Sequence, residues 1–348
     1  MLAKPDTGQE PSLAEKVAFL GEPAAYGARS PVARRETHMS LVFFADGSVY
    51  KLKKPVRLAY LDFSTLPRRE AACRAEFALN QTLAPGIYQG VIPLVRTGGA
   101  LRLGGQGEVV DWLVHMRRLD EACTLEARIL RRDLSRSELD ALAEVLVRFY
   151  RRARRTRGAP QALLARWRAQ VAENGAVLLD PALGLPLGLV RRLMGVEQRF
   201  LRVRGPRLRR RAARILDGHG DLRPEHIWLG SEAKIIDRLE FSEALRSVDP
   251  LDEMAFLDLE CERLGAPDAG RRLRRQVLSG LHEAPAPELY LFYRIYRALL
   301  RARLSIAHLL EPEPRTPEKW PRQARAYLAI AARDARRLEV LLRRPAGP

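Results

Sequence analysis

The sequence predicts an α+β fold of two lobes, a small lobe that mixes strands with a helix and a large lobe that is mainly helical. Two observations support this prediction. Residues 31–118 show alternating apolar segments on either side of one helical segment, in the order strand, strand, helix, strand, strand. Residues 119–348 show helical spacing almost throughout, interrupted by a polar stretch at 217–240. A chain of 348 residues is long enough for two lobes.

Residues 1–30 are rich in Gly, Pro and Ala, and we expect a flexible leader there with one short helical segment at 11–20. The small lobe then opens with a hairpin, because Asp46-Gly47 separates two apolar segments. The elements expected in this lobe are strands at 41–44 and 49–53, a helix at 67–84, and strands at 91–96 and 109–116.

In the large lobe, apolar residues recur at helical spacing, and Pro or Ser stands at several of the expected helix starts. The helices expected are 125–130, 135–155, 160–179, 185–203, 249–264, 269–281, 288–310 and 317–343.

Composition narrows the class of protein. The formal net charge is +18 and the isoelectric point is about 10.5, which permits a polyanionic partner. The basic residues are mostly Arg spread along amphipathic helices, and no aromatic residues interleave with them to stack on bases. We therefore expect an Arg-rich surface and not a nucleic-acid partner.

The three cysteines are widely spaced and no apolar run reaches the roughly 20 residues of a membrane span, which favours a cytoplasmic, bacterial protein.

The polar segment His219-Gly220-Asp221-Leu222-Arg223 matches the catalytic loop of kinases, His-Arg-Asp-Leu-x-x-x-x-Asn, up to its last position, which is His226 instead of Asn. Asp221 is the candidate base, or the carboxylate that orients a hydroxyl, and its alternative role is to cap a turn. Arg223 could stabilise a transferring phosphoryl group, or could be a solvated surface residue.

Asp237 follows the short apolar segment Lys234-Ile235-Ile236, which places a carboxylate at the end of a strand. It resembles the metal-binding Asp that follows the catalytic loop of kinases on a short apolar strand, and it is the candidate Mg²⁺ ligand that bridges the phosphates of ATP. The alternative is an Asp that begins a turn.

Lys51 and Lys53 stand out in a chain that otherwise prefers Arg, and both lie on the same face of the second strand as Val49. We prefer Lys51 as the residue that contacts the nucleotide phosphates, with Lys53 as second choice. Glu76 on the following helix is the expected ion-pair partner. The alternative is an edge strand protected by lysines. No Gly-x-x-x-x-Gly-Lys-Ser/Thr or Gly-x-Gly-x-x-Gly loop follows a strand, so neither a P-loop nor a Rossmann site is expected.

Together these segments resemble the aminoglycoside phosphotransferase and choline kinase-like branch of the protein-kinase-like fold. More narrowly, the chain resembles bacterial proteins of the aminoglycoside phosphotransferase family that are often fused to a P-loop ATPase domain. The segments that carry the resemblance are Glu36-Thr37-His38, Tyr50-Lys51-Leu52-Lys53-Lys54-Pro55, Leu61-Asp62-Phe63-Ser64-Thr65-Leu66, Ala84-Pro85-Gly86-Ile87-Tyr88, Val114-His115-Met116-Arg117-Arg118, His219-Gly220-Asp221, Asp237 to Phe241, Leu245 to Asp249 and Glu253 to Leu257.

The resemblance implies a two-lobed kinase-like fold with ATP between the lobes. It implies that Val114 and Met116 belong to a hinge whose backbone holds adenine, that Asp221 is catalytic and that Asp237 binds the metal. It also implies that Glu253 braces the catalytic loop, where the family usually has Asp.

His226 is the main departure from the family pattern. Mg²⁺ prefers oxygen ligands, and an imidazole suits Mn²⁺ better, so the expected cofactors are ATP with Mg²⁺ and, as an alternative, Mn²⁺. Arg238-Leu239 also replaces the usual aromatic-led pair after Asp237.

The leading hypothesis is an ATP-dependent phosphotransferase that acts on a hydroxyl of a small molecule. Its rival is a weak or inactive kinase-like protein that binds nucleotide and regulates a partner, and a weaker third is an Arg-rich nucleic-acid binder. The sequence leaves the acceptor and the oligomeric state open. A chain this basic disfavours a polycationic aminoglycoside as acceptor.

Overall fold

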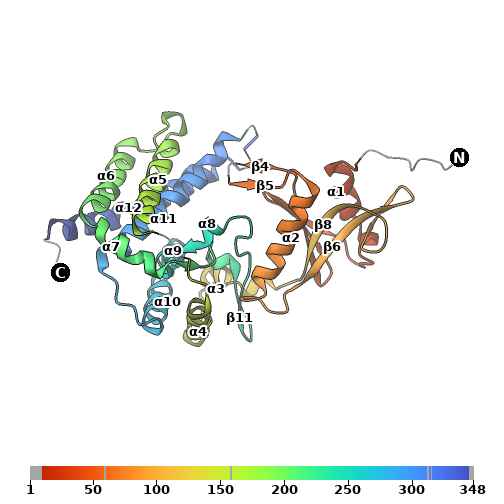
Figure 1. Ribbon diagram of the computed structural model, residues 1–348, viewed down its shortest axis with the longest axis horizontal. Coiled ribbons are helices and arrows are strands. Elements are labelled where there is room, and N and C mark those ends of the chain that lie inside the picture. The colour runs from red at the N-terminus through yellow and green to blue at the C-terminus, as the bar shows by residue number, and fades with distance from the viewer. Residues whose placement is uncertain (1–9, 59, 157–158, 312, 315, 345–348) are drawn as a thin grey trace. The chain divides into compact units, whose positions relative to one another are not determined.

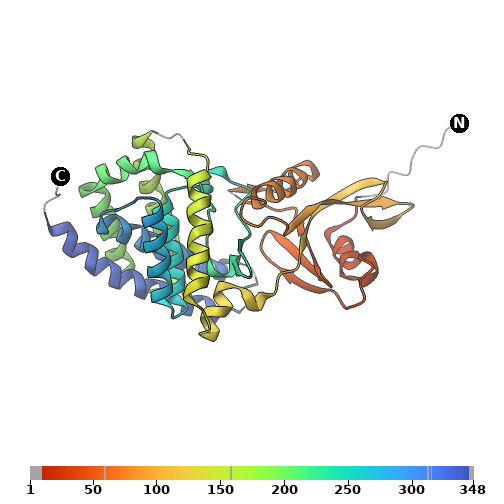
Figure 2. The same cartoon turned by 90° about the horizontal axis from the view of Figure 1, so that it is seen from below.

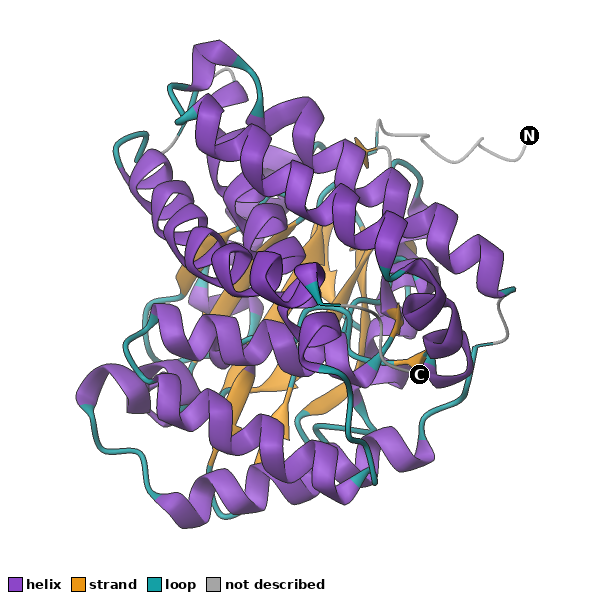
Figure 3. Cartoon of the chain, turned by 90° about the vertical axis from the view of Figure 1, so that its left-hand side faces the viewer, coloured by secondary structure: helices purple, strands orange, loops and turns teal. Residues whose placement is uncertain are grey.

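The computed structural model describes residues 10–58, 60–156, 159–311, 313–314 and 316–344. They form two compact units (Figure 1). Unit 1 comprises residues 1–121 with the segment 234–243, and unit 2 comprises residues 122–233 and 244–348. The predicted α+β class is confirmed, because unit 1 is built on an antiparallel sheet and unit 2 is largely helical (Figure 3). The sequence placed 234–243 in the large lobe, whereas the structure packs it with the small one.

Unit 1 contains a six-stranded antiparallel sheet in the order β1-β2-β3-β8-β6-β7. The strands are β1 (Ala33–Glu36), β2 (Ser40–Ala45), β3 (Ser48–Lys53), β6 (Tyr88–Thr97), β7 (Ala100–Leu103) and β8 (Glu108–Arg117), with a separate short pair β4 (Arg57–Leu58) and β5 (Leu61–Asp62). β1 and β7 were not predicted from the sequence. β7 lies between the predicted strands at 91–96 and 109–116, and it pairs with the end of β6.

The two faces of this sheet are covered by different helices. Helix α2 (Leu66–Asn80) packs on β8 and β6, and its Cys73 joins an apolar cluster with Val49 (Figure 1). The opposite face carries Leu52 and packs against α1 (Leu13–Gly21) through Leu20. Strand alternation therefore sends Val49, with its neighbours at 51 and 53, toward α2.

Helix α1 lies in the segment that we expected to be a flexible leader. Its capping box joins Ser12 and Glu15, and Leu20 is fully buried against the sheet. Lys16 is buried as well, with Nζ 2.9 Å from Asp111 Oδ2. A buried ion pair and a buried Leu anchor the helix, so the described part of residues 1–30 is docked on the sheet, ending in the short 3₁₀ turn η1 (Pro23–Ala25).

The helices predicted for the large lobe are present with similar bounds. The observed helices are α3 (Leu125–Arg131), α4 (Arg136–Arg152), α5 (Pro160–Leu178), α6 (Leu187–Val203), α7 (Gly205–Arg210), α8 (Glu243–Arg246), α9 (Pro250–Arg263), α10 (Pro267–Gly280), α11 (Pro287–Ala307) and α12 (Lys319–Arg343). Of these, α7 and α8, which begins at the last residue of the unit 1 segment, were not predicted. Short 3₁₀ turns are η2 (Glu121–Cys123), η3 (Pro181–Leu183), η4 (Arg211–Arg214), η5 (Pro224–His226) and η6 (His308–Leu310). The remaining strands are β9 (Leu216–Asp217), β10 (Ile227–Leu229), β11 (Ala233–Ile235) and β12 (Ser247–Val248).

Helix α11 is the centre of unit 2, and most of its residues are buried. It packs along α12 and against α9, α5 and α6, while α4 lies beside α10 (Figure 2). Aromatic rings fill the centre: Trp167 meets Tyr296 edge to face at 4.7 Å, and Phe200 stacks on Phe292 at 4.4 Å. None of the helices in the described ranges is both long and apolar enough to cross a bilayer.

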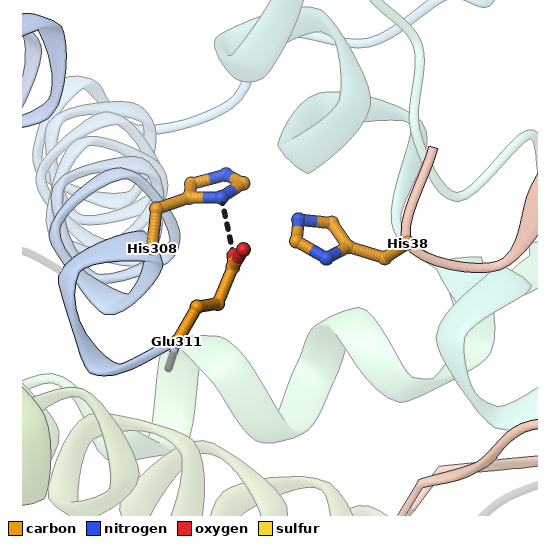
Figure 4. A group of neighbouring side chains, drawn as sticks. All are labelled: His38, His308 and Glu311. Carbon is orange, nitrogen blue, oxygen red and sulfur yellow. Dashed lines mark hydrogen bonds and ion pairs between the residues drawn. The ribbon is translucent and has the colours of Figure 1, made fainter. Parts of the chain in front are cut away.

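The turn that links α11 to α12 is held by side-chain contacts within unit 2. His308 Nδ1 lies 2.8 Å from Glu311 Oε1 (Figure 4), and the His308 ring stacks on Trp320 at 3.8 Å. These contacts fix the place where the chain reverses direction.

Candidate active site

Lys51 of β3 lies at the centre of a buried ion-pair cluster in unit 1. Its Nζ is 2.9 Å from Glu76 Oε1 and 2.8 Å from Asp237 Oδ1. The strand points Lys51 at α2, and Glu76 lies on the turn of α2 that faces the sheet. The ion pair expected from the sequence between Lys51 and Glu76 is therefore present, and the same lysine also holds Asp237.

Lys53 occupies a deeper position in the same cluster. Its Nζ is 2.7 Å from Glu76 Oε2 and also bonds Glu240. Because side chains two residues apart share a strand face, both lysines reach the same glutamate from one side. Glu76 thus has one carboxylate oxygen for each lysine.

Exposure separates the two lysines. The side chain of Lys53 is 0% exposed and that of Glu76 is 1% exposed, whereas Lys51 is 15% and Asp237 is 43% exposed. Lys51 and Asp237 can therefore meet a ligand from solvent, whereas Lys53 lies behind them. The geometry favours Lys51 over Lys53 as the lysine that reaches a bound phosphate.

The cluster holds two ammonium groups and three carboxylates. Burial alone would lower the pKa of Lys51, but Asp237 and Glu76 raise it well above its usual value, so the ammonium stays charged. Burial raises the pKa of Glu240, the carboxylate that is most shielded from water after Glu76, even though Lys53 lies beside it.

Asp237 is placed by an unusual backbone conformation. Its φ is +63°, in the left-handed region that only a few residue types adopt readily, Asp among them. Its N–H bonds the Tyr88 hydroxyl at 3.1 Å, and the next N–H, of Arg238, bonds Asn80 Oδ1 at 3.0 Å. The conformation, which costs on the order of 1–3 kcal/mol, turns the chain sharply after β11 and presents the carboxylate to Lys51.

Val114 and Met116 lie on β8, opposite Lys51 and Val49 of β3. Both are buried in the apolar cluster on the α2 face. β8 pairs with β3 on one side and with β6 on the other, so its peptide groups are used within the sheet. These two residues can therefore offer a base apolar side chains, and the chain leaves the sheet only after the N–H of Arg118, which bonds Gly47 O.

In unit 2, Glu253 holds the catalytic-loop segment from the first turn of α9. Its Oε2 accepts from the N–H of His219 at 3.1 Å and from the Tyr150 hydroxyl at 3.0 Å, and its Oε1 accepts from the N–H of Gly220 at 2.6 Å. Glu253 is 1% exposed. The family resemblance implied that Glu253 braces this loop, and these hydrogen bonds to the N–H groups of His219 and Gly220 are how it does so.

The close approach of Glu253 and Val248 to the loop leaves no room for a side chain at Gly218. A Cβ at this position would lie 2.6 Å from Glu253 Oε2 and 2.4 Å from Val248 Cγ2, which no side chain can do without moving the loop. Gly220, with φ of +90°, makes the turn that follows. The glycines on either side of His219 thus allow the loop to close over Glu253.

Asp221 and the two residues predicted to act with it contact one another. Arg223 Nε lies 2.9 Å from Asp221 Oδ2, and Arg223 also bonds Glu225. His226 Nδ1 is 2.9 Å from the Asp221 carbonyl oxygen, and His226 Nε2 is 3.2 Å from Arg223 Nη2. A guanidinium only donates, so Nε2 accepts and the ring proton resides on Nδ1. Both ring nitrogens of His226 are therefore used within the loop.

The charge state of Asp221 follows from these neighbours. Burial alone would raise the pKa of Asp221, but Arg223, His226 and Arg301 hold it at about 2. The carboxylate is ionised at neutral pH, and its side chain remains 26% exposed. Because Arg223 Nε bonds Oδ2, the carboxylate can accept a hydrogen bond from a hydroxyl at Oδ1.

Several contributing residues were not assigned a role from the sequence. Glu240 completes the lysine cluster, and Tyr88 bonds the N–H of Asp237. In unit 2, Tyr150 shares Glu253 with the loop, and Arg301 of α11 contributes to the low pKa of Asp221. Glu240 and Tyr88 lie in segments that carry the family resemblance, which was the only signal for them. Tyr150 and Arg301 lie in helices with no such signal, 103 and 80 residues from their partners.

Comparison of the structure with solved structures defines the class of fold. A choline/ethanolamine kinase family protein from Mesorhizobium loti aligns with a TM-score of 0.57 over 94% of this chain and 96% of that chain, at 17% identity. A glucosamine kinase bound to glucosamine, ADP and inorganic phosphate gives a TM-score of 0.53 over 96% of this chain and 89% of that chain, at 15% identity. The chain has the fold of these kinase-like phosphotransferases.

Comparison by sequence finds a closer match. An uncharacterised protein of Mycobacterium tuberculosis strain H37Rv is 35% identical over 290 residues, which are 80% of this chain and 56% of the relative. The chain thus spans about half the length of the curated relatives that it matches. No family model matches the sequence.

Proposed function

We propose that the chain is an ATP-dependent phosphotransferase that transfers a phosphoryl group to a hydroxyl of a small molecule. The observation that carries this proposal is the arrangement of Lys51, Glu76 and Asp237 in unit 1. A lysine fixed by a buried glutamate and joined to an exposed carboxylate is the arrangement that positions nucleotide phosphates in kinases. The fold shared with choline/ethanolamine and glucosamine kinases supports the same class of reaction.

Each residue would have a defined part in the reaction. Lys51 would bind the α- and β-phosphates as a point charge, held in place by Glu76. Asp221 would orient the acceptor hydroxyl and take its proton as the oxygen bonds the γ-phosphorus and the bond to the ADP oxygen breaks. A carboxylate with a pKa of about 2 is a weak base, so orientation would be its main contribution. Arg223 would move from Asp221 to the transferring phosphoryl group.

The donor set fits a magnesium ion only in part. Asp237 offers an exposed carboxylate, a hard oxygen ligand that suits Mg²⁺. His226 fits less well, because its lone pair on Nε2 already accepts from Arg223 and because Mg²⁺ prefers oxygen. When bound, Mg²⁺ neutralises phosphate charge. A metal would require Asp237 to share its carboxylate with Lys51.

The test is ATP turnover by the purified chain with a panel of hydroxyl compounds, in Mg²⁺ and in Mn²⁺. We expect Asp221→Asn to lower turnover by roughly 10²-fold or more while ATP binding is retained. Asp180→Asn is a matched control, since Asp180 only caps the short turn η3 and Asn caps as well. Turnover that is unchanged in Asp221→Asn would contradict the proposal.

A second candidate is a kinase-like protein that binds nucleotide without transferring phosphate. It is favoured by the bonds that tie Arg223 to Asp221 and to His226, because in this arrangement the carboxylate and the imidazole are both occupied. The same assay separates the two functions: saturable ATP binding with no turnover in either metal would favour this candidate.

A further inference from the structure

Unit 2 contains a cavity to which the proposed phosphotransfer assigns no role. Its volume is about 880 Å³, and its walls come from the second half of α9, from α10, from the start of α11 and from the end of α12. Its lining does not include the residues of the catalytic-loop segment: the last residue of α11 that lines it, Arg294, lies seven residues before Arg301, which acts on Asp221. At 1.5 Å per residue, that is about 10 Å along the helix.

The walls carry more cationic than anionic groups. The arginines are Arg271, Arg274, Arg294, Arg333 and Arg337, against three carboxylates. Two of these arginines are hydrogen-bonded to two of the carboxylates. Arg294 and Arg333 both bond Glu262 and both bond Asp334, with distances of 2.6–3.0 Å for the contacts of normal length.

The third carboxylate is also occupied. Asp258 accepts a bond from the Tyr290 hydroxyl and lies 3.5 Å from Arg294. Arg274 is left 3.8 Å from Asp258, too far for a hydrogen bond, and its guanidinium lies over the Tyr290 ring at 4.2 Å. Its Nε is buried with no hydrogen-bond partner among the described residues. Arg274 is therefore a cation held over the Tyr290 ring, with a hydrogen-bond donor, Nε, that no described residue uses.

Two more arginines of the lining have weak partners or none among the described residues. Arg337 is exposed and makes no ion pair with any residue that the structure describes. Arg271 pairs only with Asp268, whose side chain is 93% exposed, and such surface pairs are weak. A second space of about 530 Å³ shares Arg271, Arg274 and Leu278 with the cavity, and extends the basic wall along α10 to Arg275.

Apolar residues also line the cavity, and Leu278 and Leu341 each lie one helical turn beyond an arginine of the wall. Leu278, Leu291 and Leu341 line it together with Pro285 and Pro287. Val340, which also lines it, is 52% exposed. Guanidinium donors beside an apolar wall match a ligand that carries both an anionic group and a hydrocarbon part.

We propose that this cavity binds a small amphiphilic anion, with a phosphate or carboxylate head against Arg274 and Arg337 and an apolar chain against Leu278, Leu291 and Leu341. The planar guanidinium of Arg274, held by stacking on Tyr290, would give two parallel hydrogen bonds to the head. Arg337 would close over it.

The test is calorimetric titration of the whole chain with n-octyl phosphate and, in parallel, octanoate, inorganic phosphate and octanol. We expect saturable one-site binding of at least one of the two amphiphiles, and binding of phosphate and octanol at least about tenfold weaker. Arg337→Gln and Arg274→Gln should each weaken binding by about tenfold, the loss of one charge-assisted hydrogen bond.

The control is Arg191→Gln, since Arg191 is exposed on α6, outside the residues that line the cavity, and should leave binding unchanged. The thermal midpoint checks that each variant is folded, and Arg337, being exposed, can be replaced without disturbing the core. Failure of both amphiphiles to bind saturably would overturn the proposal. Binding that both cavity variants leave unchanged, or that Arg191→Gln reduces equally, would overturn it as well. The outcome does not depend on ATP turnover.

Discussion

Lys51 and Lys53 show how two identical side chains on one strand face acquire different tasks. Both bond Glu76, yet Lys51 keeps contact with solvent and with Asp237, whereas Lys53 is sealed between Glu76 and Glu240. A buried ion pair holds its surroundings in place, and a partly exposed one can exchange partners with a ligand. We therefore propose that Lys51 contacts the nucleotide and that Lys53 supports it.

Replacement of each lysine should separate these roles. Lys51→Ala should weaken ATP binding by about tenfold or more with a small change in thermal midpoint, because the lost group contacts phosphate. Lys53→Ala should destabilise the fold by roughly 3–5 kcal/mol, because it leaves Glu240 buried and uncompensated. Lys54→Ala is the control, since Lys54 pairs with the half-buried Glu36. A fluorescent nucleotide and thermal unfolding measure the two effects, and strong ATP binding by Lys51→Ala would reverse the assignment.

His226 allows a second prediction. His226→Asn should preserve or raise the turnover supported by Mg²⁺, because the amide can donate to the Asp221 carbonyl as Nδ1 does and also offers an oxygen ligand. The wild-type chain should work better with Mn²⁺ than with Mg²⁺. Turnover rates in the two metals check both statements. If the variant binds ATP but neither metal supports turnover, the regulatory function is favoured.

The charge of Asp221 gives a pH prediction. Its pKa in the folded chain, about 2, lies below the ordinary value of 3.8, so its contribution to stability is present above pH 3.8 and is lost as pH falls toward 2. The pH profile of turnover should therefore show no acid limb from Asp221 above about pH 4. Arg223→Gln removes the guanidinium that does most to lower the pKa of Asp221, so it should move such an acid limb to higher pH. An identical acid limb in both proteins would contradict this assignment.

At the scale of elements, hydrogen bonds join the start of α9 to the candidate catalytic loop. Asp249 caps the helix by accepting from the N–H of Leu251, and one turn later Glu253 accepts the N–H groups of His219 and Gly220. The buried helix thus fixes the loop that carries Asp221. Burial raises the pKa of Glu253, while the two backbone N–H groups and Arg297 act in the opposite direction.

Gly218→Ala tests this coupling without removing a polar group. The new Cβ would overlap Glu253 Oε2 and Val248, so the loop must shift and turnover should fall by about tenfold or more, because misplacement of the loop by a fraction of an ångström displaces Asp221. ATP affinity should change little, because Lys51 lies in the other unit. The matched control is Gly195→Ala on the exposed face of α6, where no atom lies within 4 Å of the new Cβ, and it should stabilise the chain by roughly 0.5–1 kcal/mol. Full turnover in Gly218→Ala would show that the loop tolerates displacement.

At the scale of the whole molecule, unit 1 is built from two separate stretches of chain. Residues 234–243 return to it and bring Asp237 and Glu240 to the lysines of β3. The N–H of Ile235 also bonds Leu83 O, so the returning segment is tied to the end of α2. Unit 1 therefore depends on a segment that lies more than 100 residues away in the sequence.

A fragment experiment tests this dependence. Residues 1–121 alone should unfold at a lower temperature than the same residues joined to 234–243 by a flexible Gly/Ser linker, because the added segment supplies the partners of Lys51 and Lys53. The control is the linked fragment carrying Glu240→Ala, in which most of the gain should vanish. Equal melting of the linked and unlinked fragments would show that the sheet and α2 suffice.

The sequence by itself determined the fold class, the order of most elements and the shared face of Val49, Lys51 and Lys53. These depend on local periodicity, which records which side of each element is buried. The ion pair of Lys51 with Glu76 could be predicted for the same reason, since both lie on the faces that strand and helix turn toward each other.

Only the tertiary structure decided which features complete the site. It placed residues 234–243 with the sheet, docked α1 where a flexible leader was expected, buried Lys53 behind Lys51 and used both ring nitrogens of His226 within its loop. Each of these depends on contacts between side chains whose positions no local pattern encodes. Periodicity tells which face of an element is buried, but which partner meets that face is determined by how the whole chain packs.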